Sequence, residues 1–285
     1  MLKTHKTKLS ILLLLLHPAF LRGADLKSET LQAWDDYVHH AQVRMQDCSR
    51  AQAPFLLVDE TRELSERVRS GEILVEPEGG KSPHPVLRGL IHDWVGVVFV
   101  PNAKLDDVVG VLNSYERYKD YYRPMVVNSR LLEEGPNREL VRLLMIQKAY
   151  SVTAAAEADD EVHFVRLDGN RAYSLSTSIR VQEIADYGKP SAHAFPQDHG
   201  PGYIWRTFTV TRLEERDGGT YAEMEMVALS RGIPWAFRWL AQPLTERLPQ
   251  RILGTMLRDT RAAVVNELRT APSITAGLAQ SSDHR

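Results

Sequence analysis

The sequence lacks a second cysteine and the compact motifs of metal or phosphate chemistry. Cys48 stands alone, so no disulfide can form within the chain, and stability must come from a packed core. We interpret Cys48 as an inert, partly buried thiol, with a bridge to another chain as the alternative. No His pair stands at helical spacing around a Glu, and neither a G-x-S-x-G elbow nor a Gly-rich phosphate loop is present. We therefore expect no metal and no cofactor.

The sequence also lacks an excess of either charge. Its 35 basic and 37 acidic residues give a formal net charge of −2, and the basic residues are scattered rather than clustered. A protein that binds nucleic acid normally carries a basic surface that meets the phosphates. The sequence therefore predicts no nucleic-acid partner. Its 43% hydrophobic and 25% charged residues are typical of a globular protein with a sizeable core.

Only one long apolar run is present, and it lies at the N-terminus. Leu9–Leu16 is interrupted by Ser10 alone, follows three lysines and precedes the small residues Gly23 and Ala24. This pattern predicts a secretory signal peptide over residues 1–24. The run is well short of the roughly 20 residues that span a membrane. We therefore expect export, to the periplasm or to the medium.

Two alternatives to a cleaved signal peptide stay open: an uncleaved anchor and a stray apolar N-terminus. Arg22 would occupy the third position before a cut after Ala24, where a small residue is preferred, so the exact cleavage site is also open. Cleavage there would remove four basic residues and no acidic one, which changes the net charge from −2 to −6. The mature chain would be mildly acidic.

Residues 25–75 are predicted to form a helical extension. Apolar residues recur every three or four positions over residues 29–46, which predicts an amphipathic helix after an N-cap at Ser28. A second helix is predicted over residues 61–69. The stretch 76–88 is rich in proline and glycine, which predicts a loop or linker. We place the boundary of the second domain there.

Residues 89–269 are predicted to form an α+β domain. A strand rich in β-branched and aromatic residues comes first, at residues 90–100, and a helix follows at 104–113. Short loops between the strands that come next favour an antiparallel meander. These strands are predicted at residues 126–132, 139–150, 152–156, 161–167, 173–184, 203–213 and 221–229.

The domain is predicted to close with helices. A short helix at residues 235–241 is interrupted by Pro243, and Pro249 opens a long helix to about Leu268 that carries a broad apolar stripe. Residues 270–285, rich in Ser, Ala and Gly, predict a disordered tail. A sheet covered by one long helix must curl around it. We expect this curling to leave a gap between the sheet and the helix.

Three segments of this domain carry a resemblance to a known family. They are Trp94–Pro101, Tyr115–Pro124 and Ser230–Trp235. With the order of elements over residues 90–268, they resemble the START and birch-pollen-allergen (SRPBCC) superfamily, in a branch of exported bacterial proteins. Ser114 stands where an Asp is common in the family. The resemblance implies an α+β helix-grip fold with an internal cavity for a lipid-like or hydrophobic small molecule, and it marks a fold more than a chemistry.

The candidate ligand contacts are apolar side chains that suit an adaptable cavity, and two arginines on strand faces that are otherwise small or apolar. Each apolar residue, taken singly, is better explained as ordinary core, so the cavity hypothesis depends on the family resemblance. The candidates are Trp94, Arg180, Arg206, Phe208, Met224, Met226, Trp235, Trp239 and Met256.

Arg206 alternates with apolar residues such as Phe208 along one strand face, and Arg180 similarly interrupts its own strand. An unpaired buried guanidinium costs several kcal/mol, so an inward arginine needs a carboxylate, water or a ligand group. We predict that both arginines meet the polar end of an otherwise apolar ligand. The alternatives are an ion pair with a glutamate of the neighbouring strand, or a shift by one residue that turns Trp205 inward.

Two classes of function fit these features. The first is an exported soluble protein that binds or carries an apolar molecule, with transient contact to a membrane surface left open. The second is a cyclase- or hydrolase-type enzyme with a His–Asp pair as general base, for which the candidates are His199, Asp198 and His92. A solvated loop and structural ion pairs explain the same residues without catalysis. An enzyme needs one of these histidines bonded to a carboxylate and open to the cavity.

Overall fold

The computed structural model describes residues 24–50, 53–136, 138–149, 152–232 and 238–270. The predicted signal peptide and tail therefore lie almost wholly outside the described residues. A small two-stranded pair joins β1 (Ala24–Asp25) to β10 (His199–Gly200). The other strands are β2 (Leu74–Pro77), β3 (His84–Val86), β4 (Gly89–Pro101), β5 (Val126–Glu134), β6 (Glu139–Ala149), β7 (Val152–Arg166), β8 (Arg171–Ala185), β9 (His193–Ala194), β11 (Arg206–Arg216) and β12 (Gly219–Arg231).

The helices follow the apolar periodicity of the sequence. Thr61 caps one of them by accepting a hydrogen bond from the backbone N–H of Leu64. Among the described helices, none combines the length and the hydropathy that a membrane crossing requires. The helices are α3 (Ser28–Ser49), α4 (Arg62–Arg69), α5 (Leu105–Leu112), α6 (Tyr118–Tyr121) and α7 (Arg238–Thr270).

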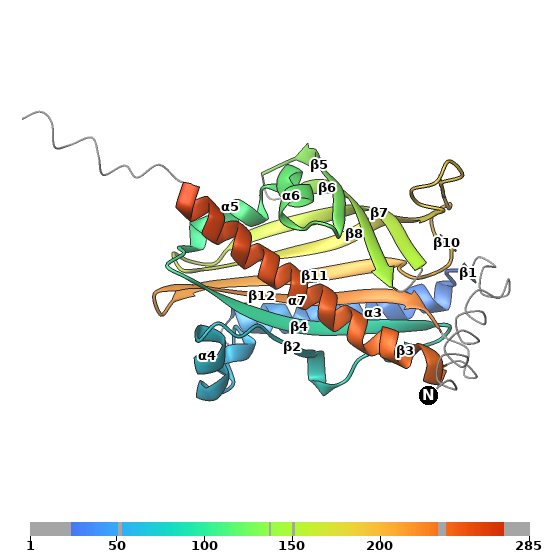
Figure 1. Cartoon of the computed structure of the whole chain (residues 1–285). Helices are drawn as coiled ribbons and strands as arrows, with labels where there is room; N and C mark the ends of the chain where they lie inside the picture. Colours follow the sequence, from blue (N-terminus) through green and yellow to red (C-terminus); the bar gives the residue numbers. More distant parts are fainter. Residues whose placement is uncertain (1–23, 51–52, 137, 150–151, 233–237, 271–285) are drawn as a thin grey trace, which may run out of the picture.

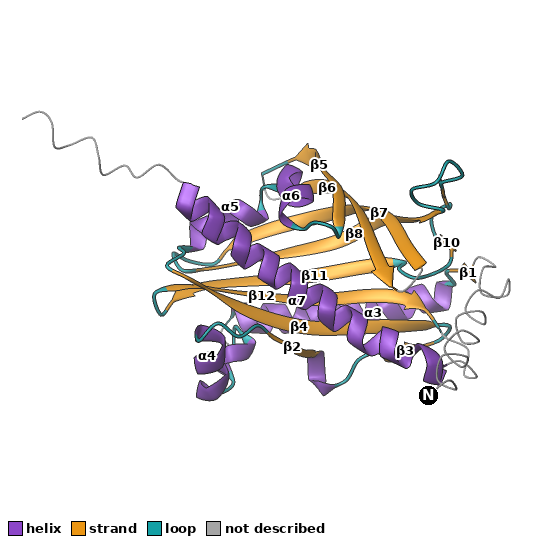
Figure 2. Cartoon of the chain, viewed as in Figure 1, coloured by secondary structure: helices purple, strands orange, loops and turns teal. Residues whose placement is uncertain are grey.

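The described strands other than β1 and β10 form one antiparallel sheet in the order β2-β4-β12-β11-β8-β7-β6-β5, with β3 beside β4 and β9 beside β8. Figures 1 and 2 show α7 crossing one face of this sheet and α3 lying behind the other. We call these the α7 face and the α3 face. Successive strand residues point to opposite faces, so a strand covered on both must be apolar throughout. β4 fits this rule, because it is buried from Gly89 to Val100.

Helix α7 packs mainly on β4, and to a smaller extent on α5, β2 and β12. Its Leu253, Leu257 and Val264 are buried in one cluster with Trp94 of β4. Gly96 of β4 permits this close approach, because a Cβ built there would lie 2.8 Å from Leu257 Cδ1. The apolar stripe predicted for the last helix is therefore the surface that holds α7 against the sheet.

Helix α3 covers the opposite face of the sheet. Its residues Trp34, Val38, Ala41 and Met45 recur at helical spacing and are buried. They pack against apolar side chains of the central strands, including Phe208. The N-terminal extension, whose packing partner the sequence leaves open, thus covers the sheet of its own chain.

A buried ionic network joins α3 to the sheet. Arg212 donates hydrogen bonds of 2.8 Å to Glu223 and to Glu225. Arg44 of α3 donates to Glu225 at 2.6 Å and lies 3.4 Å from Asp93 Oδ2. Burial, aided by the charge of Glu225, raises the pKa of Asp93 to about 7. Three buried carboxylates therefore share two guanidiniums, of which Arg212 is buried and Arg44 is partly exposed. Loss of Arg212 leaves buried carboxylates without their buried partner.

Three local expectations differ from the structure. The strands predicted at 152–156 and 161–167 are one continuous strand, β7. The stretch 76–88, predicted as a loop or linker, holds the end of β2 and all of β3, and both pair with β4. Helix α7 runs through Pro243 and Pro249 rather than breaking at the first. A proline removes one backbone donor, and a helix held by tertiary packing can continue through it.

Candidate functional site

Two central strands carry hydroxyl groups on the α7 face. Along part of β8 and β11 every second residue is Ser or Thr, and alternation puts these side chains on the same face as Ala172 and Leu213 of the α7 core. The intervening Tyr173, Phe208 and Val210 pack with the α3 core. We call the set the hydroxyl stripe: it comprises Ser174, Ser176, Thr207, Thr209 and Thr211.

The strand register gives the hydroxyl stripe two apolar borders. Thr209 pairs with Ser176 on one side and with Met226 on the other, and Met226 pairs with Trp94. Beyond the stripe, Ser176 pairs with Val162. Side chains directly opposite each other across neighbouring strands are in contact distance, so the stripe is a polar band between apolar side chains. The next row repeats the order with Gly96, Met224, Thr211, Ser174 and Phe164.

The stripe hydroxyls have no hydrogen-bond partner among the residues that the structure describes. Within the described ranges, none of the five makes a side-chain hydrogen bond. Thr211 is buried, whereas the other four are only half-buried. Helix α7 lies mainly over β4, to one side of the stripe. Half-buried hydroxyls without a protein partner are completed by water or by a ligand.

Two buried polar side chains at the margins of the stripe also lack partners in the described part of the chain. Asp160 pairs in register with Ser178, is 9% exposed, and its Oδ1 has no hydrogen-bond partner. Burial, with the charge of Asp159 as the smaller cause, raises the pKa of Asp160 to about 7. Trp94 is 7% exposed and its indole N–H has no acceptor. Leaving such a group unsatisfied costs about 1–3 kcal/mol, which a ligand or water would relieve.

Three tyrosines fix the helices at one end of this region. The Tyr122 hydroxyl hydrogen-bonds Thr260 Oγ1 of α7 at 2.9 Å, and the Tyr118 hydroxyl donates to the last carbonyl of α5 at 2.5 Å. The Tyr115 hydroxyl donates to Glu139 of β6. Burial raises the pKa of Tyr122 to about 12, so its hydroxyl is neutral near pH 7. These bonds hold α5, α6 and α7 in a set position above the sheet.

Four of the predicted contact residues meet on the α7 face. Trp94 lies beside Met226 in register, with Met224 one row further along. Met256 of α7 packs against the same apolar cluster, and Met226 and Met256 are half-buried. Met224 and Met226 border the hydroxyl stripe, and the contact of all four residues with a ligand stays a prediction. Outside the described part of the structure lie two further candidates, Trp235 and the side chain of Trp239.

Arg206 and Phe208 lie on the opposite, α3 face. Phe208 is fully buried in the core under α3. Arg206 Nη1 donates to Asp198 Oδ1 and to the carbonyl oxygen of Trp205, each at 2.7 Å. The prediction that this strand face meets the space under α7 is therefore wrong. The alternation is present, but α3 supplies a second apolar cover, and these side chains turn toward it.

Arg180 also points away from α7. Its guanidinium donates to both oxygens of Asp159, at 2.7 and 3.0 Å, and to Glu157 at 2.6 Å. Arg142 of β6 binds Asp159 at 2.6 and 2.9 Å. Because neighbours along a strand face opposite sides, Asp159 and its arginines lie across the sheet from Asp160. The expected inward orientation of Arg180 is wrong, and the residue belongs to a structural ion-pair cluster.

The predicted pairing of Asp198 with His199 is not formed. Asp198 accepts a hydrogen bond from an arginine instead, and His199 Nδ1 lies 2.8 Å from Asp25 Oδ1 on the exposed β1–β10 pair. His92 lies on the α7 face, with Nε2 2.9 Å from Ser230 Oγ. Within the described ranges, no group of three or more His, Cys, Asp or Glu side chains could hold a metal ion.

The hydroxyl stripe was not among the predicted site residues, although the sequence contains a signal for it. In Ala172–Ser178 and Thr207–Leu213, Ser and Thr alternate with larger side chains at period two, which is the pattern of a strand whose two faces differ. Asp160 had no comparable signal. Its burial depends on β6 and β8 on either side.

Comparisons with known proteins find no matching family model and no matching curated protein. Among solved structures, the chain is similar to the Zhui aromatase/cyclase from Streptomyces sp. R1128, with 15% identity, 64% of this chain and 98% of that chain covered, and a TM-score of 0.46. It is similar to a STAR-related lipid transfer protein from Xanthomonas axonopodis, with 20% identity, coverages of 65% and 98%, and a TM-score of 0.41. For human STARD10 the identity is 7%, the coverages are 66% and 76%, and the TM-score is 0.41.

At these identities and scores, the similarities bear on neither ligand nor activity. The architecture of the chain itself is specific. One antiparallel sheet has its first long strand, β4, beside its last, β12, and a long C-terminal helix lies across it. The α+β class and the helix-grip arrangement predicted from the sequence are confirmed. The chain has a helix-grip fold, with an N-terminal helix on the α3 face of the sheet.

Proposed function

We propose that this protein binds, on the α7 face of its sheet, an apolar molecule that carries several hydrogen-bonding groups. The observation that supports this proposal is the hydroxyl stripe, whose side chains are unpartnered in the described structure and bordered by apolar residues. A pure hydrocarbon placed there would strip water from the hydroxyls and return no hydrogen bond. A molecule with oxygen atoms spaced along an apolar skeleton would satisfy both the stripe and its borders.

The proposal is tested by identifying what the protein carries. Full-length protein purified from its own cells is extracted with organic solvent, and the extract is analysed by mass spectrometry. We expect one apolar compound with two or more oxygen-bearing groups, in an amount close to that of the protein. The double variant Ser176→Ala/Thr209→Val removes two central hydroxyls while keeping side-chain volume. It should lower the amount of bound compound about tenfold or more, since each lost hydrogen bond contributes about 0.5–1.5 kcal/mol.

Thr177→Val is the matched control, because Thr177 adjoins Ser176 in β8 and faces α3 instead. It should leave the bound compound unchanged. An empty protein, a bound compound without polar groups, or equal losses in the double variant and the control would each contradict the proposal. Circular dichroism and thermal unfolding of all variants establish that the fold is kept.

We also propose that the protein is exported, on the strength of its charged, short-cored N-terminus. N-terminal sequencing of protein recovered from the cell envelope tests this. A start near Asp25 supports cleavage of a signal peptide. An intact Met1 on a membrane-bound form would replace the soluble protein with an anchored one.

A second candidate function is chemistry on the bound molecule. Asp160 favours it, because a buried carboxyl with a pKa raised to about 7 by burial exists in both protonation states near neutral pH. Such a group suits general acid–base catalysis. The same extraction separates the two functions: if Asp160→Asn accumulates a different compound from the wild type, Asp160 acts on the ligand. If the compound is the same, the protein binds without converting.

A further inference from the structure

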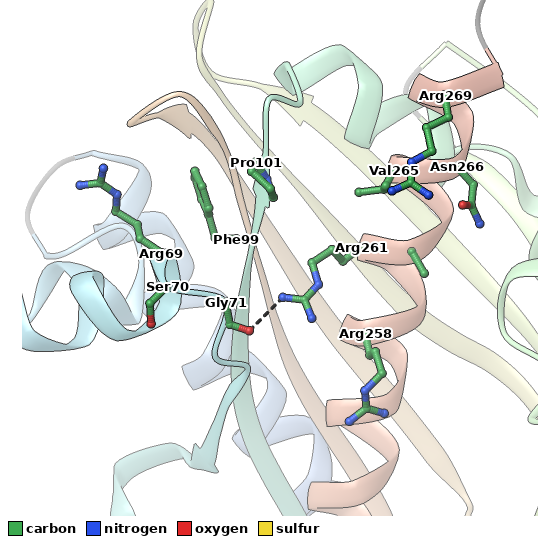
Figure 3. Close-up of a pocket in the computed structure, with 11 residues that line it drawn as sticks. Arg69, Ser70, Gly71, Phe99, Pro101, Arg258, Arg261, Val265, Asn266 and Arg269 are labelled. Carbon is green, nitrogen blue, oxygen red and sulfur yellow. Dashed lines mark hydrogen bonds between the residues drawn. The ribbon is translucent and has the colours of Figure 1, made fainter.

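Helix α7 also borders a groove on the side away from the hydroxyl stripe. A hollow of about 550 Å³ lies between α7, the turn after α4 and the end of β4, and Figure 3 shows its lining residues. A second hollow of about 520 Å³ lies between α7, β2 and the segment before it. Arg258 lines both. The two hollows therefore make one groove along α7, which we call the arginine groove.

Arginines are concentrated along this groove, although the chain as a whole has no excess of positive charge. Its lining has one acidic residue, Glu72, and Arg67 already binds that carboxylate at 2.6 and 2.9 Å. The full chain carries a net charge of −2, so this concentration is local. The arginines that line the groove are Arg67, Arg69, Arg251, Arg258, Arg261 and Arg269.

The described acidic residues of α7 do not line the groove. Glu267 pairs with Arg117 at 2.7 Å and accepts a hydrogen bond from Tyr121, on the side of α5 and α6. Asp259 is half-buried; burial raises its pKa, and the charge of the neighbouring Arg258 opposes this as the smaller cause. In the described part of the helix, α7 thus presents arginines toward α4 and a bound carboxylate toward α6. In the described part of α7, no carboxylate lines the groove, although Asp259 adjoins Arg258.

Most groove arginines have no partner in the described structure. Arg261 Nη1 donates to the carbonyl oxygen of Gly71 at 3.0 Å, which ties α7 to the turn after α4 (Figure 3). Arg69, Arg251, Arg258 and Arg269 make no hydrogen bond or ion pair with any described residue. A guanidinium presents a planar fork of donors that matches phosphate oxygens. Several such forks around one hollow would hold a phosphoryl group through charge-assisted hydrogen bonds.

We propose that the arginine groove is a binding site for a phosphoryl group, carried either by a phospholipid head group or by a soluble phosphate ester. The first hollow also has apolar walls from Phe99, Pro101 and Val265, which would contact the carbon part of the molecule next to the phosphate. This site is separate from the hydroxyl stripe, because it lies on the other side of α7. Its occupancy therefore does not depend on the ligand proposed above.

Two probes distinguish the sources of the phosphoryl group. Full-length protein is titrated with inorganic pyrophosphate in a calorimeter, and it is sedimented with phosphatidylcholine vesicles made with and without phosphatidylglycerol. The proposal expects saturable binding to at least one probe. Binding to pyrophosphate alone indicates a soluble phosphate ester, and retention that requires phosphatidylglycerol indicates a lipid head group.

The variant Arg258→Gln/Arg269→Gln removes two unpaired groove arginines and leaves Arg261 on Gly71. It should weaken binding about tenfold or more, because each charge-assisted hydrogen bond contributes about 1.5–3 kcal/mol. The control Arg62→Gln/Arg123→Gln removes the same charge from exposed arginines outside the groove, and should change binding less than twofold. No saturable binding to either probe, or equal weakening in variant and control, would overturn the proposal.

Discussion

Asp160 is a buried carboxyl whose protonation should be visible in the stability of the protein. Burial raises its pKa from 3.8 to about 7, so the folded state binds this proton more tightly than the unfolded state. Its contribution to stability is complete below about pH 4 and is lost as the pH rises through about 7. The Asp160→Asn variant carries no charge at any pH. We expect its stability relative to the wild type to increase by roughly 1–3 kcal/mol between pH 5 and pH 8.

Urea unfolding at the two pH values measures this difference. Other buried carboxyls, such as Asp93, titrate in both proteins and cancel in the comparison. A stability difference that is the same at pH 5 and pH 8 would show that Asp160 is charged in the folded protein throughout this range.

Arg212 is the central cation of the network under α3. It is buried and binds Glu223 and Glu225 at 2.8 Å each. Arg212→Met leaves two buried carboxylates short of a partner, so we expect a loss of about 3–5 kcal/mol in the free energy of unfolding. Adding Glu223→Gln should restore part of that loss, because one of the two charges is then removed. Arg62→Met, at an exposed pair with Glu66, should cost less than about 0.5 kcal/mol.

Denaturant unfolding at pH 8 measures the free energy of unfolding of the wild type and of the three variants. This pH is chosen because the buried carboxyls are more fully charged there. If Arg212→Met costs no more than Arg62→Met, the network does not hold α3 to the sheet. If the added Glu223→Gln deepens the loss, the carboxylate itself stabilises the fold, for example through its hydrogen bond from the backbone N–H of Leu57 at 2.6 Å.

At the scale of elements, the close packing of α7 on β4 depends on the absence of a side chain at Gly96. A Cβ there would lie 2.8 Å from Leu257 Cδ1 and 3.0 Å from the carbonyl oxygen of Leu74. Gly96→Ala should therefore cost about 1–3 kcal/mol, the usual range for overpacking. Gly110→Ala is the matched control, because a Cβ at this exposed position of α5 meets nothing within 4 Å. It should gain about 0.5–1 kcal/mol from helix propensity.

Thermal unfolding of the two alanine variants checks the signs of these two predicted changes in stability. Opposite shifts in Tm confirm that α7 is packed tightly on β4. Equal shifts would mean that α7 can move away from β4 at little cost, and the hydroxyl stripe would then be more open than the structure indicates.

The elements themselves could be predicted from periodicity, but the faces of the strands could not. Apolar spacing predicted α3, α4 and the long strands β4, β5, β6, β8, β11 and β12 to within a few residues, because each signal is local. It divided β7 into two strands and did not predict β9 or β10. In β11, Arg206 and Phe208 do share one face as predicted. Which helix covers that face depends on α3, more than 150 residues earlier in the chain. Alternation fixes relative orientation within a strand, and only tertiary packing decides which side is inward.

The hydroxyl stripe was missed for a related reason. Ser and Thr in a strand are equally typical of a solvated face, and the sequence shows no sign that Ser176 and Thr209 lie opposite each other across two strands. Met224 and Met226 were recognised because apolar side chains indicate burial on their own. A polar band within a covered face emerges only from the register of β8 and β11.

At the scale of the whole molecule, the sheet separates two layers with different roles. The α3 face is closed by apolar packing and by the ionic network. The α7 face combines apolar packing on β4 and β12 with unpartnered hydroxyls on β8 and β11. A protein that must admit a ligand on one face benefits from a rigid opposite face. The N-terminal extension then has a structural purpose that the helix-grip core alone would lack.

Removal of this extension tests that division. Deleting residues 1–75 exposes apolar side chains of the α3 face, including Phe208 and Tyr221, which are fully buried in the whole protein. It also takes Arg44 from the network and leaves Glu225 facing water or a neighbouring molecule. Large exposed apolar patches cause association, so we expect residues 76–285 to be insoluble or to unfold without a cooperative transition. Residues 24–285, which keep α3, should be soluble and unfold cooperatively. If residues 76–285 fold as a monomer with an unchanged Tm, the helix-grip core is independent, and α3 serves another purpose than covering the sheet.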